Sequence, residues 1–125
     1  MNLKIMLLPN RFKQAKTYSK LSGHSDYHIG AALFNKRKFM VGGFNSLKSH
    51  PAFTPKTLHA EIHAILRGTA IGFPLSGATL AVYREHKSGR PAIARPCSRC
   101  WAVIRSVNIK KVLFTTNNGW QEERV

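Results

Sequence analysis

The chain has 125 residues, of which 43% are hydrophobic and 10% aromatic. This composition can bury one hydrophobic core but not two, and it excludes a disordered chain. Lys and Arg number 20 against 5 Asp and Glu, a formal net charge of +15 that is spread along the chain. A folded domain this basic attracts polyanions, so nucleic acid is a candidate partner, with a general composition effect as the alternative.

The first residues and the cysteines indicate the compartment. A short apolar run before Pro9 is broken by Lys4 and lacks a small-residue cleavage site, which does not fit a secretory signal peptide. No stretch approaches the roughly 20 apolar residues of a membrane span. Only Cys97 and Cys100 occur, too few for the disulfide framework of a small secreted domain. We therefore expect a cytoplasmic protein with no membrane partner.

The first half of the chain predicts a helix, two strands and a second helix. Residues 11–21 mix basic and apolar side chains and end near Gly23, as expected for a helix. Apolar runs predict strands over 27–35 and 39–44, joined by a basic turn. The second helix is expected to begin at Thr54-Pro55, or at Thr57, and to end at Gly68.

The second half predicts a strand over 77–83, a basic loop over 84–96 and a third helix from about Cys97. Strands are then expected over 112–116 and 120–124, because Asn118-Gly119 is a strong hairpin signal. The predicted fold is α/β: a single mixed five-stranded sheet with about three helices packed on it. Its last two strands form an antiparallel hairpin, and one domain spans residues 1–125.

Two short motifs carry the candidate chemistry. His59-Ala60-Glu61 lies at the opening of the second helix, and Pro96-Cys97-Ser98-Arg99-Cys100 at the opening of the third. Two thiolates and one imidazole make a zinc site with three protein ligands, and the fourth position stays open for water, as in catalytic zinc sites. Helix N-termini favour thiolate over thiol. Glu61 is too close to His59 in sequence to be an easy co-ligand, but it can move the protons of that water.

The order of these motifs matches the H-x-E…P-C-x-x-C pattern of zinc nucleobase deaminases. From about His28 onward the chain resembles the cytidine deaminase superfamily, and more particularly small phage-type cytidine or deoxycytidylate deaminases. Gly30-Ala31-Ala32 and Phe44-Asn45-Ser46 are part of the resemblance. It implies the following roles: zinc ligands His59, Cys97 and Cys100, proton shuttle Glu61, a bond from Asn45 to the sugar hydroxyl, and a backbone contact from Ala60 to the base.

The end of the chain bears on the substrate. In the superfamily, members that act on cytosine nucleosides often end in antiparallel strands, and the hairpin at Asn118-Gly119 leaves no room for a crossover of a dozen or more residues. This disfavours adenosine editing. Tetrameric nucleoside deaminases usually carry cysteine where this chain has His59, so the branch and the substrate stay open.

The predicted function is zinc-dependent hydrolytic deamination of cytosine to uracil. The charge favours cytosine in single-stranded nucleic acid, and the alternative is free cytidine, deoxycytidine, CMP or dCMP. An alternative of another class is a non-catalytic zinc-stabilised nucleic-acid-binding module, with His63 or His86 as a fourth ligand. A homo-oligomer is compatible with either function.

Two other interpretations of the motifs are disfavoured. A zincin protease would use His59 and His63, but its glutamate would stand where this chain has Ala60. A redox role for the cysteines would leave His59-Ala60-Glu61 unexplained. The aromatic residues Phe53, Tyr83 and Trp101 are open to two interpretations, stacking on a base or packing in the core.

Overall fold

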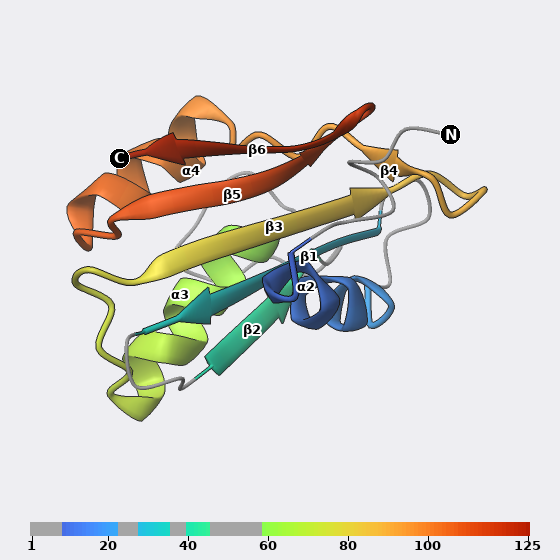
Figure 1. The fold of residues 1–125 in the computed structure, drawn as a ribbon. Coiled ribbons are helices and arrows are strands. Elements are labelled where there is room, and N and C mark those ends of the chain that lie inside the picture. Colours follow the sequence, from blue (N-terminus) through green and yellow to red (C-terminus); the bar gives the residue numbers. More distant parts are fainter. Residues whose placement is uncertain (1–8, 23–27, 36–39, 46–58) are drawn as a thin grey trace.

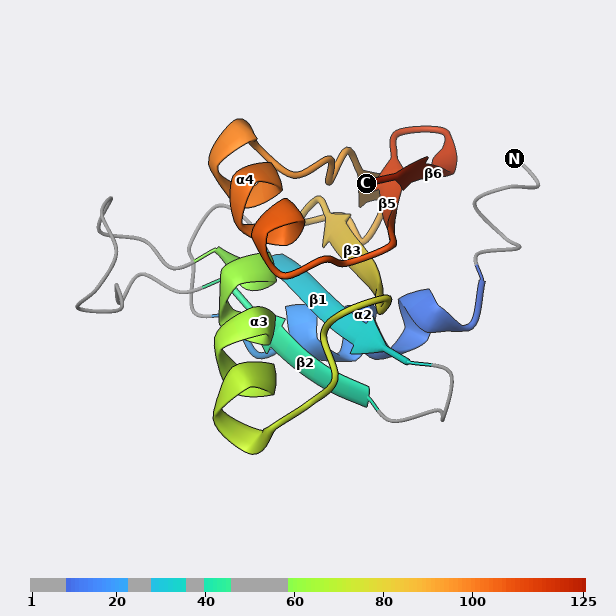
Figure 2. The same ribbon diagram turned by 90° about the vertical axis from the view of Figure 1, so that its left-hand side faces the viewer.

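The structure is a computed structural model, and it describes residues 9–22, 28–35, 40–45 and 59–125. A six-stranded mixed sheet has the order β2-β1-β3-β5-β6, with β4 paired to β3 (Figure 1). One helix, α2, covers one face of the sheet, and α3 and α4 cover the other (Figure 2). The predicted α/β class with about three helices on one sheet is confirmed.

The elements have these bounds: α2 Arg11–Ser19, β1 His28–Phe34, β2 Met40–Phe44, α3 Ala60–Ile71, β3 Thr79–Glu85, β4 Pro91–Ala92, α4 Ser98–Ser106, β5 Lys111–Thr116 and β6 Gly119–Arg124. None of the helices in the described ranges is long and apolar enough to cross a membrane.

Strand pairing brings the termini of strands that are distant in sequence to one end of the sheet. β1 is antiparallel to both β2 and β3, and β3 is parallel to β5. The end of β2, the start of β1 and the end of β3 therefore lie at the same end of the sheet. β5 and β6 form the predicted antiparallel hairpin. Thr116 pairs with Gly119, so the turn is Asn117-Asn118, one residue earlier than the signal at Asn118-Gly119 indicated.

The sixth strand, β4, is a correction to the five strands predicted. The sequence predicts a loop over residues 84–96, but the chain turns back at His86, whose N–H donates to the carbonyl of Arg90 at 2.8 Å. Pro91–Ala92 then pair with the end of β3, with the proline at the first position, where a strand tolerates it. Thr115 Oγ1 accepts the N–H of Arg84 at 3.1 Å and donates to the carbonyl of Ala92 at 2.7 Å, which anchors the approach to α4.

Both predicted ends of the second helix are wrong. Thr54, Pro55 and Thr57 lie outside the described residues, but His59 has an extended backbone (φ −75°, ψ 146°), so α3 begins at Ala60. The helix continues past Gly68 to Ile71 and ends at Gly72, whose φ of 74° suits glycine. The N–H of Phe73 donates to the carbonyl of Gly68 at 2.8 Å and closes the last turn.

Candidate zinc and active site

Two helix N-termini carry the residues that the sequence singled out. His59 is the N-cap of α3 and Cys97 is the N-cap of α4, and both have extended backbones. Cys100 lies in the first turn of α4 and is fully buried, whereas Cys97 is exposed. The predicted start of the third helix at Cys97 is thus confirmed, and each motif lies where a helix begins.

The three candidate ligand atoms lie close together. His59 Nδ1 is 3.2 Å from Cys100 Sγ and 3.7 Å from Cys97 Sγ. The three atoms lie within 4.8 Å of one another, and no other such group occurs among the residues that the structure describes. A tetrahedral zinc ion with ordinary bond lengths would hold nitrogen and sulfur ligands about 3.6 Å apart. The spacing therefore fits zinc, and the group does not include His63 or His86.

The ionisable groups around the three candidate ligand atoms also favour a bound cation. Burial raises the pKa of the Cys100 thiol, and the neighbouring Glu61 and Cys97 raise it further. Burial likewise raises the pKa of the Glu61 carboxyl, while its own backbone N–H, His59 and Cys100 lower it. The buried Cys100 thiol and the buried Glu61 carboxyl thus lie together beside the exposed Cys97, where negative charge is costly. A divalent cation would offset that cost, because a thiol that coordinates a metal is deprotonated.

Asn45 directly follows β2 and is hydrogen-bonded to the neighbouring strand β1. Its backbone N–H donates to the carbonyl of Ile29 at 3.1 Å, and its Oδ1 accepts the N–H of Ile29 at 3.0 Å. Only 6% of Asn45 is exposed. In this side-chain amide Oδ1 is the acceptor and Nδ2 is the donor.

The aromatic candidates belong to the core. Tyr83 is buried on the α2 face, opposite α3 and α4, and its hydroxyl donates to Glu85 Oε2 at 3.0 Å. Trp101 is buried between the sheet and α4, with the guanidinium groups of Arg95 and Arg105 over its ring. Neither ring is placed to stack on a base, and Phe53 lies outside the described residues.

Sequence reasoning missed two sets of contacts. Arg95, which counted toward the basic loop, makes a bidentate ion pair with Glu123 at 2.9 and 3.0 Å. His63 Nδ1 lies 3.1 Å from the backbone nitrogen of Phe44 and 3.2 Å from its carbonyl oxygen. No local signal in the sequence could have revealed either contact, because each one joins elements that meet only in the folded chain.

Several solved structures share this fold. Cytidine deaminase from Burkholderia pseudomallei superposes with a TM-score of 0.73 at 18% identity, covering 91% of this chain and 89% of that one. The dCMP deaminase of cyanophage S-TIM5 gives 0.67 at 21% identity, with 85% and 79% covered. Cytidine deaminase from Mycobacterium leprae gives 0.59 at 23% identity, with 91% and 93% covered.

Sequence comparison assigns the family. No significant match was found among functionally characterised protein sequences. Residues 8–116 match the model of the cytidine and deoxycytidylate deaminase zinc-binding region, and this span contains both motifs and the whole sheet up to the end of β5. The chain therefore belongs to the cytidine and deoxycytidylate deaminase family.

Proposed function

We propose that this protein is a zinc-dependent hydrolytic deaminase that converts cytosine to uracil, formed by one domain over residues 1–125. The observation that carries the proposal is the convergence of His59 Nδ1 and the two cysteine sulfurs beside the buried Glu61 carboxyl. His59, Cys97 and Cys100 would hold the zinc, and zinc would supply Lewis-acid activation of a water molecule near neutral pH.

Glu61 is the residue that moves protons in this proposal. Hydrolysis adds the oxygen of water to C4 of cytosine and breaks the bond from C4 to the amino nitrogen. Glu61 accepts the first proton of the water and passes it to the ring nitrogen. It then accepts the second proton from the oxygen added at C4 and passes it to the departing amino group, so that ammonia leaves and the carboxylate is restored. Burial that raises the pKa of Glu61 suits a group that must both take up and release a proton.

Two residues are proposed to hold the substrate. Asn45 would donate from Nδ2 to a sugar hydroxyl, and its orientation by Ile29 supports this role. Ala60 would contact the base through its backbone. It is fully buried in the first turn of α3, between the candidate ligand His59 and Glu61.

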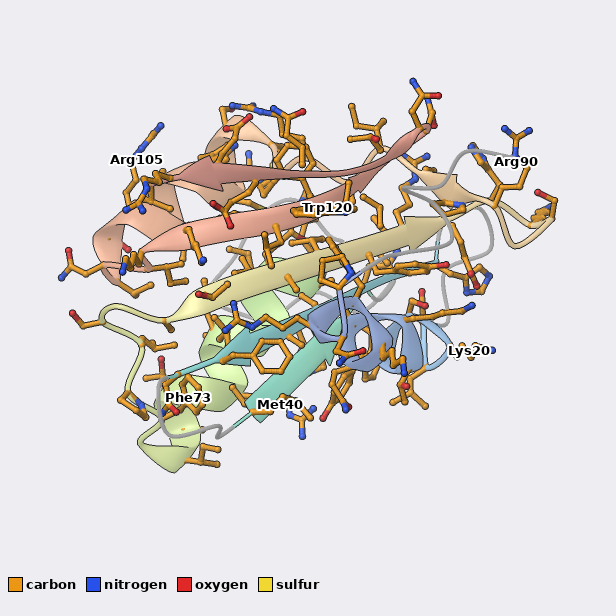
Figure 3. The ribbon with its side chains drawn as sticks, in the orientation of Figure 1. Lys20, Met40, Phe73, Arg90, Arg105 and Trp120 are labelled. Carbon is orange, nitrogen blue, oxygen red and sulfur yellow. The ribbon has the colours of Figure 1, made fainter. Side chains whose placement is uncertain are left out.

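The substrate form we infer is cytosine within single-stranded nucleic acid. The formal charge of +15 supports it, and exposed cations flank the cysteine motif: Lys87 and Arg90 in the turn before β4, and Arg99 between the two cysteines. Figure 3 shows Arg90 projecting from the end of the sheet at which β3 stops. Arg95 gives less support, because its guanidinium is paired with Glu123.

A second candidate substrate is a free nucleoside or nucleotide: cytidine, deoxycytidine, CMP or dCMP. The observation that favours it is the set of solved structures that share the fold. They include cytidine deaminases and a cyanophage dCMP deaminase in complex with dCMP and dUMP.

Product analysis tests the function and separates the two substrates. Purified protein is incubated with cytidine, dCMP and a single-stranded oligonucleotide that contains one cytosine, with Glu61→Gln as the matched inactive control. We expect uracil in the oligonucleotide from the unsubstituted protein alone. Conversion of only cytidine or dCMP would assign the free-nucleotide function. Oligonucleotide binding without any conversion would favour the non-catalytic binding module.

A further inference from the structure

The outer edge of the sheet beside the site is covered by α3. β2 is the edge strand, and edge strands direct every second pair of backbone groups away from the sheet. The N–H of Asn45 bonds to Ile29 in β1, so by alternation Phe44 and Gly42 present their backbone groups outward. Without hydrogen-bond partners, these outward N–H and C=O groups could pair with another strand.

Two side chains of α3 meet these groups. His63 Nδ1 lies 3.1 Å from the nitrogen and 3.2 Å from the oxygen of Phe44, and Arg67 Nη1 donates to the carbonyl of Gly42 at 2.8 Å. Four residues along a helix advance about 6.0 Å, and two along a strand advance about 6.8 Å. The spacing of His63 and Arg67 therefore matches the spacing of the outward groups on β2.

Close packing fixes the same contact. Gly43 has no side chain, and a Cβ atom there would lie 2.4 Å from the backbone nitrogen of Ala64 and 2.8 Å from the carbonyl oxygen of Ala60. The rings of Phe44 and His63 also pack edge to face, with centroids 4.8 Å apart. Helix α3 cannot slide or rotate on β2 without losing both the close approach and the polar contacts.

β2 and α3, which these contacts hold together, carry different parts of the candidate site. β2 leads directly into Asn45, and α3 begins with Ala60 and Glu61 after its N-cap His59. We propose that His63 and Arg67 are positioning residues, which set the place of Asn45 relative to Glu61 by clamping β2 to α3. This inference rests on the proposed deaminase function for its effect on turnover, but the clamp itself can be tested without turnover.

The first test measures by NMR whether His63 holds Phe44 and Asn45 in place. In His63→Leu, which removes the ring nitrogen but keeps apolar bulk, we expect the amide of Phe44 to exchange with solvent about tenfold faster, as for an amide that has lost one hydrogen bond. The side-chain amide signal of Asn45 should shift as well. His63→Asn, whose amide reaches the position of Nδ1, should restore both signals. Unchanged Phe44 exchange, or an unmoved Asn45 signal, in His63→Leu would overturn the proposal.

The matched control is Ile109→Val. Ile109 is buried at the opposite end of the sheet, where the N–H of Lys110 donates to the carbonyl of Ala78 at 2.8 Å. This variant should lower Tm without moving the Asn45 signal. If it moves that signal as His63→Leu does, the effect is general destabilisation and the positioning role is wrong.

The second test reads the consequence for turnover by a double-mutant cycle. We expect His63→Leu to keep its zinc and to lose about 10- to 100-fold in kcat/KM, since misplaced groups cost this much. In an Asn45→Ala background the same substitution should cost little more, because the contact that it misplaces is already gone. Additive losses would refute positioning through Asn45. A wild-type protein without deaminase activity would overturn the proposed function alone, and the NMR test would still decide the clamp.

Discussion

His59 Nδ1 lies 3.2 Å from Cys100 Sγ, although 41 positions separate the two residues in the chain. The contact exists because α3 and α4 begin close together against one face of the sheet. Neither helix can form the candidate zinc site alone, since α3 supplies the imidazole and α4 supplies both sulfurs. Folding and metal binding should therefore be coupled.

Glu61→Gln should retain zinc and the fold but lose turnover by about 10²–10⁴-fold, because only the proton-moving carboxylate is lost. Metal content by mass spectrometry, Tm and kcat should be measured together. The control Glu122→Gln removes the same charge at an exposed site on β6 and should keep full activity. Turnover of Glu61→Gln at the wild-type rate would remove Glu61 from the mechanism.

Cys100→Ser should release zinc and lower Tm, because a ligand that binds only the folded state stabilises it. Cys100 is buried and Cys97 is exposed, so we expect Cys97→Ser to lower Tm less. Ser98→Ala, in the same turn of α4, should keep the metal. Stoichiometric zinc in Cys100→Ser would contradict the ligand set.

Zinc affinity should fall as the pH is lowered. Burial raises the pKa of the Cys100 thiol, so without metal this thiol keeps its proton at neutral pH, and zinc must displace the proton in order to bind. Competition with a chelating dye at pH 6 and pH 8 measures this effect. Equal affinities at both values would show that no thiol proton is released.

Asn45→Ala and Asn45→Asp should separate the two roles of this residue. Alanine leaves the N–H of Ile29 without its acceptor, which costs about 1–3 kcal/mol of unfolding free energy. Aspartate keeps the acceptor but loses the Nδ2 donor, so it should be the more stable variant and yet lose kcat/KM. Chemical denaturation and steady-state kinetics on both variants test this, and full activity in Asn45→Asp would exclude the sugar contact.

Salt dependence should reveal the polymer contacts. Single-strand affinity falls with log salt at a slope of about −0.7 per phosphate contact, so Lys87→Gln with Arg90→Gln should flatten the slope by about 1.4. Lys110→Gln with Arg124→Gln removes two exposed charges from the opposite end of the sheet and serves as the control. Equal slopes in both double variants would mean that Lys87 and Arg90 do not contact the strand.

The sequence by itself determined the local parts of this protein. Cys97 and Cys100 share one helical turn, and His59 and Glu61 flank the start of another, so their spacing follows from short-range geometry. The final hairpin and the approximate strands also follow from turn residues and apolar patterning within a few positions. These signals were enough to predict the α/β class and the donor set.

Only the tertiary structure decided which distant groups meet. It extended α3 to Ile71, added β4, paired Arg95 with Glu123, and placed Tyr83 on the face away from the candidate site. It also brought His63 to the outer edge of β2. Each of these contacts depends on how close two elements pack. That distance is set by residues far apart in sequence. Gly43 is an example, because its lack of a side chain lets α3 approach β2 closely. No local pattern encodes such a distance.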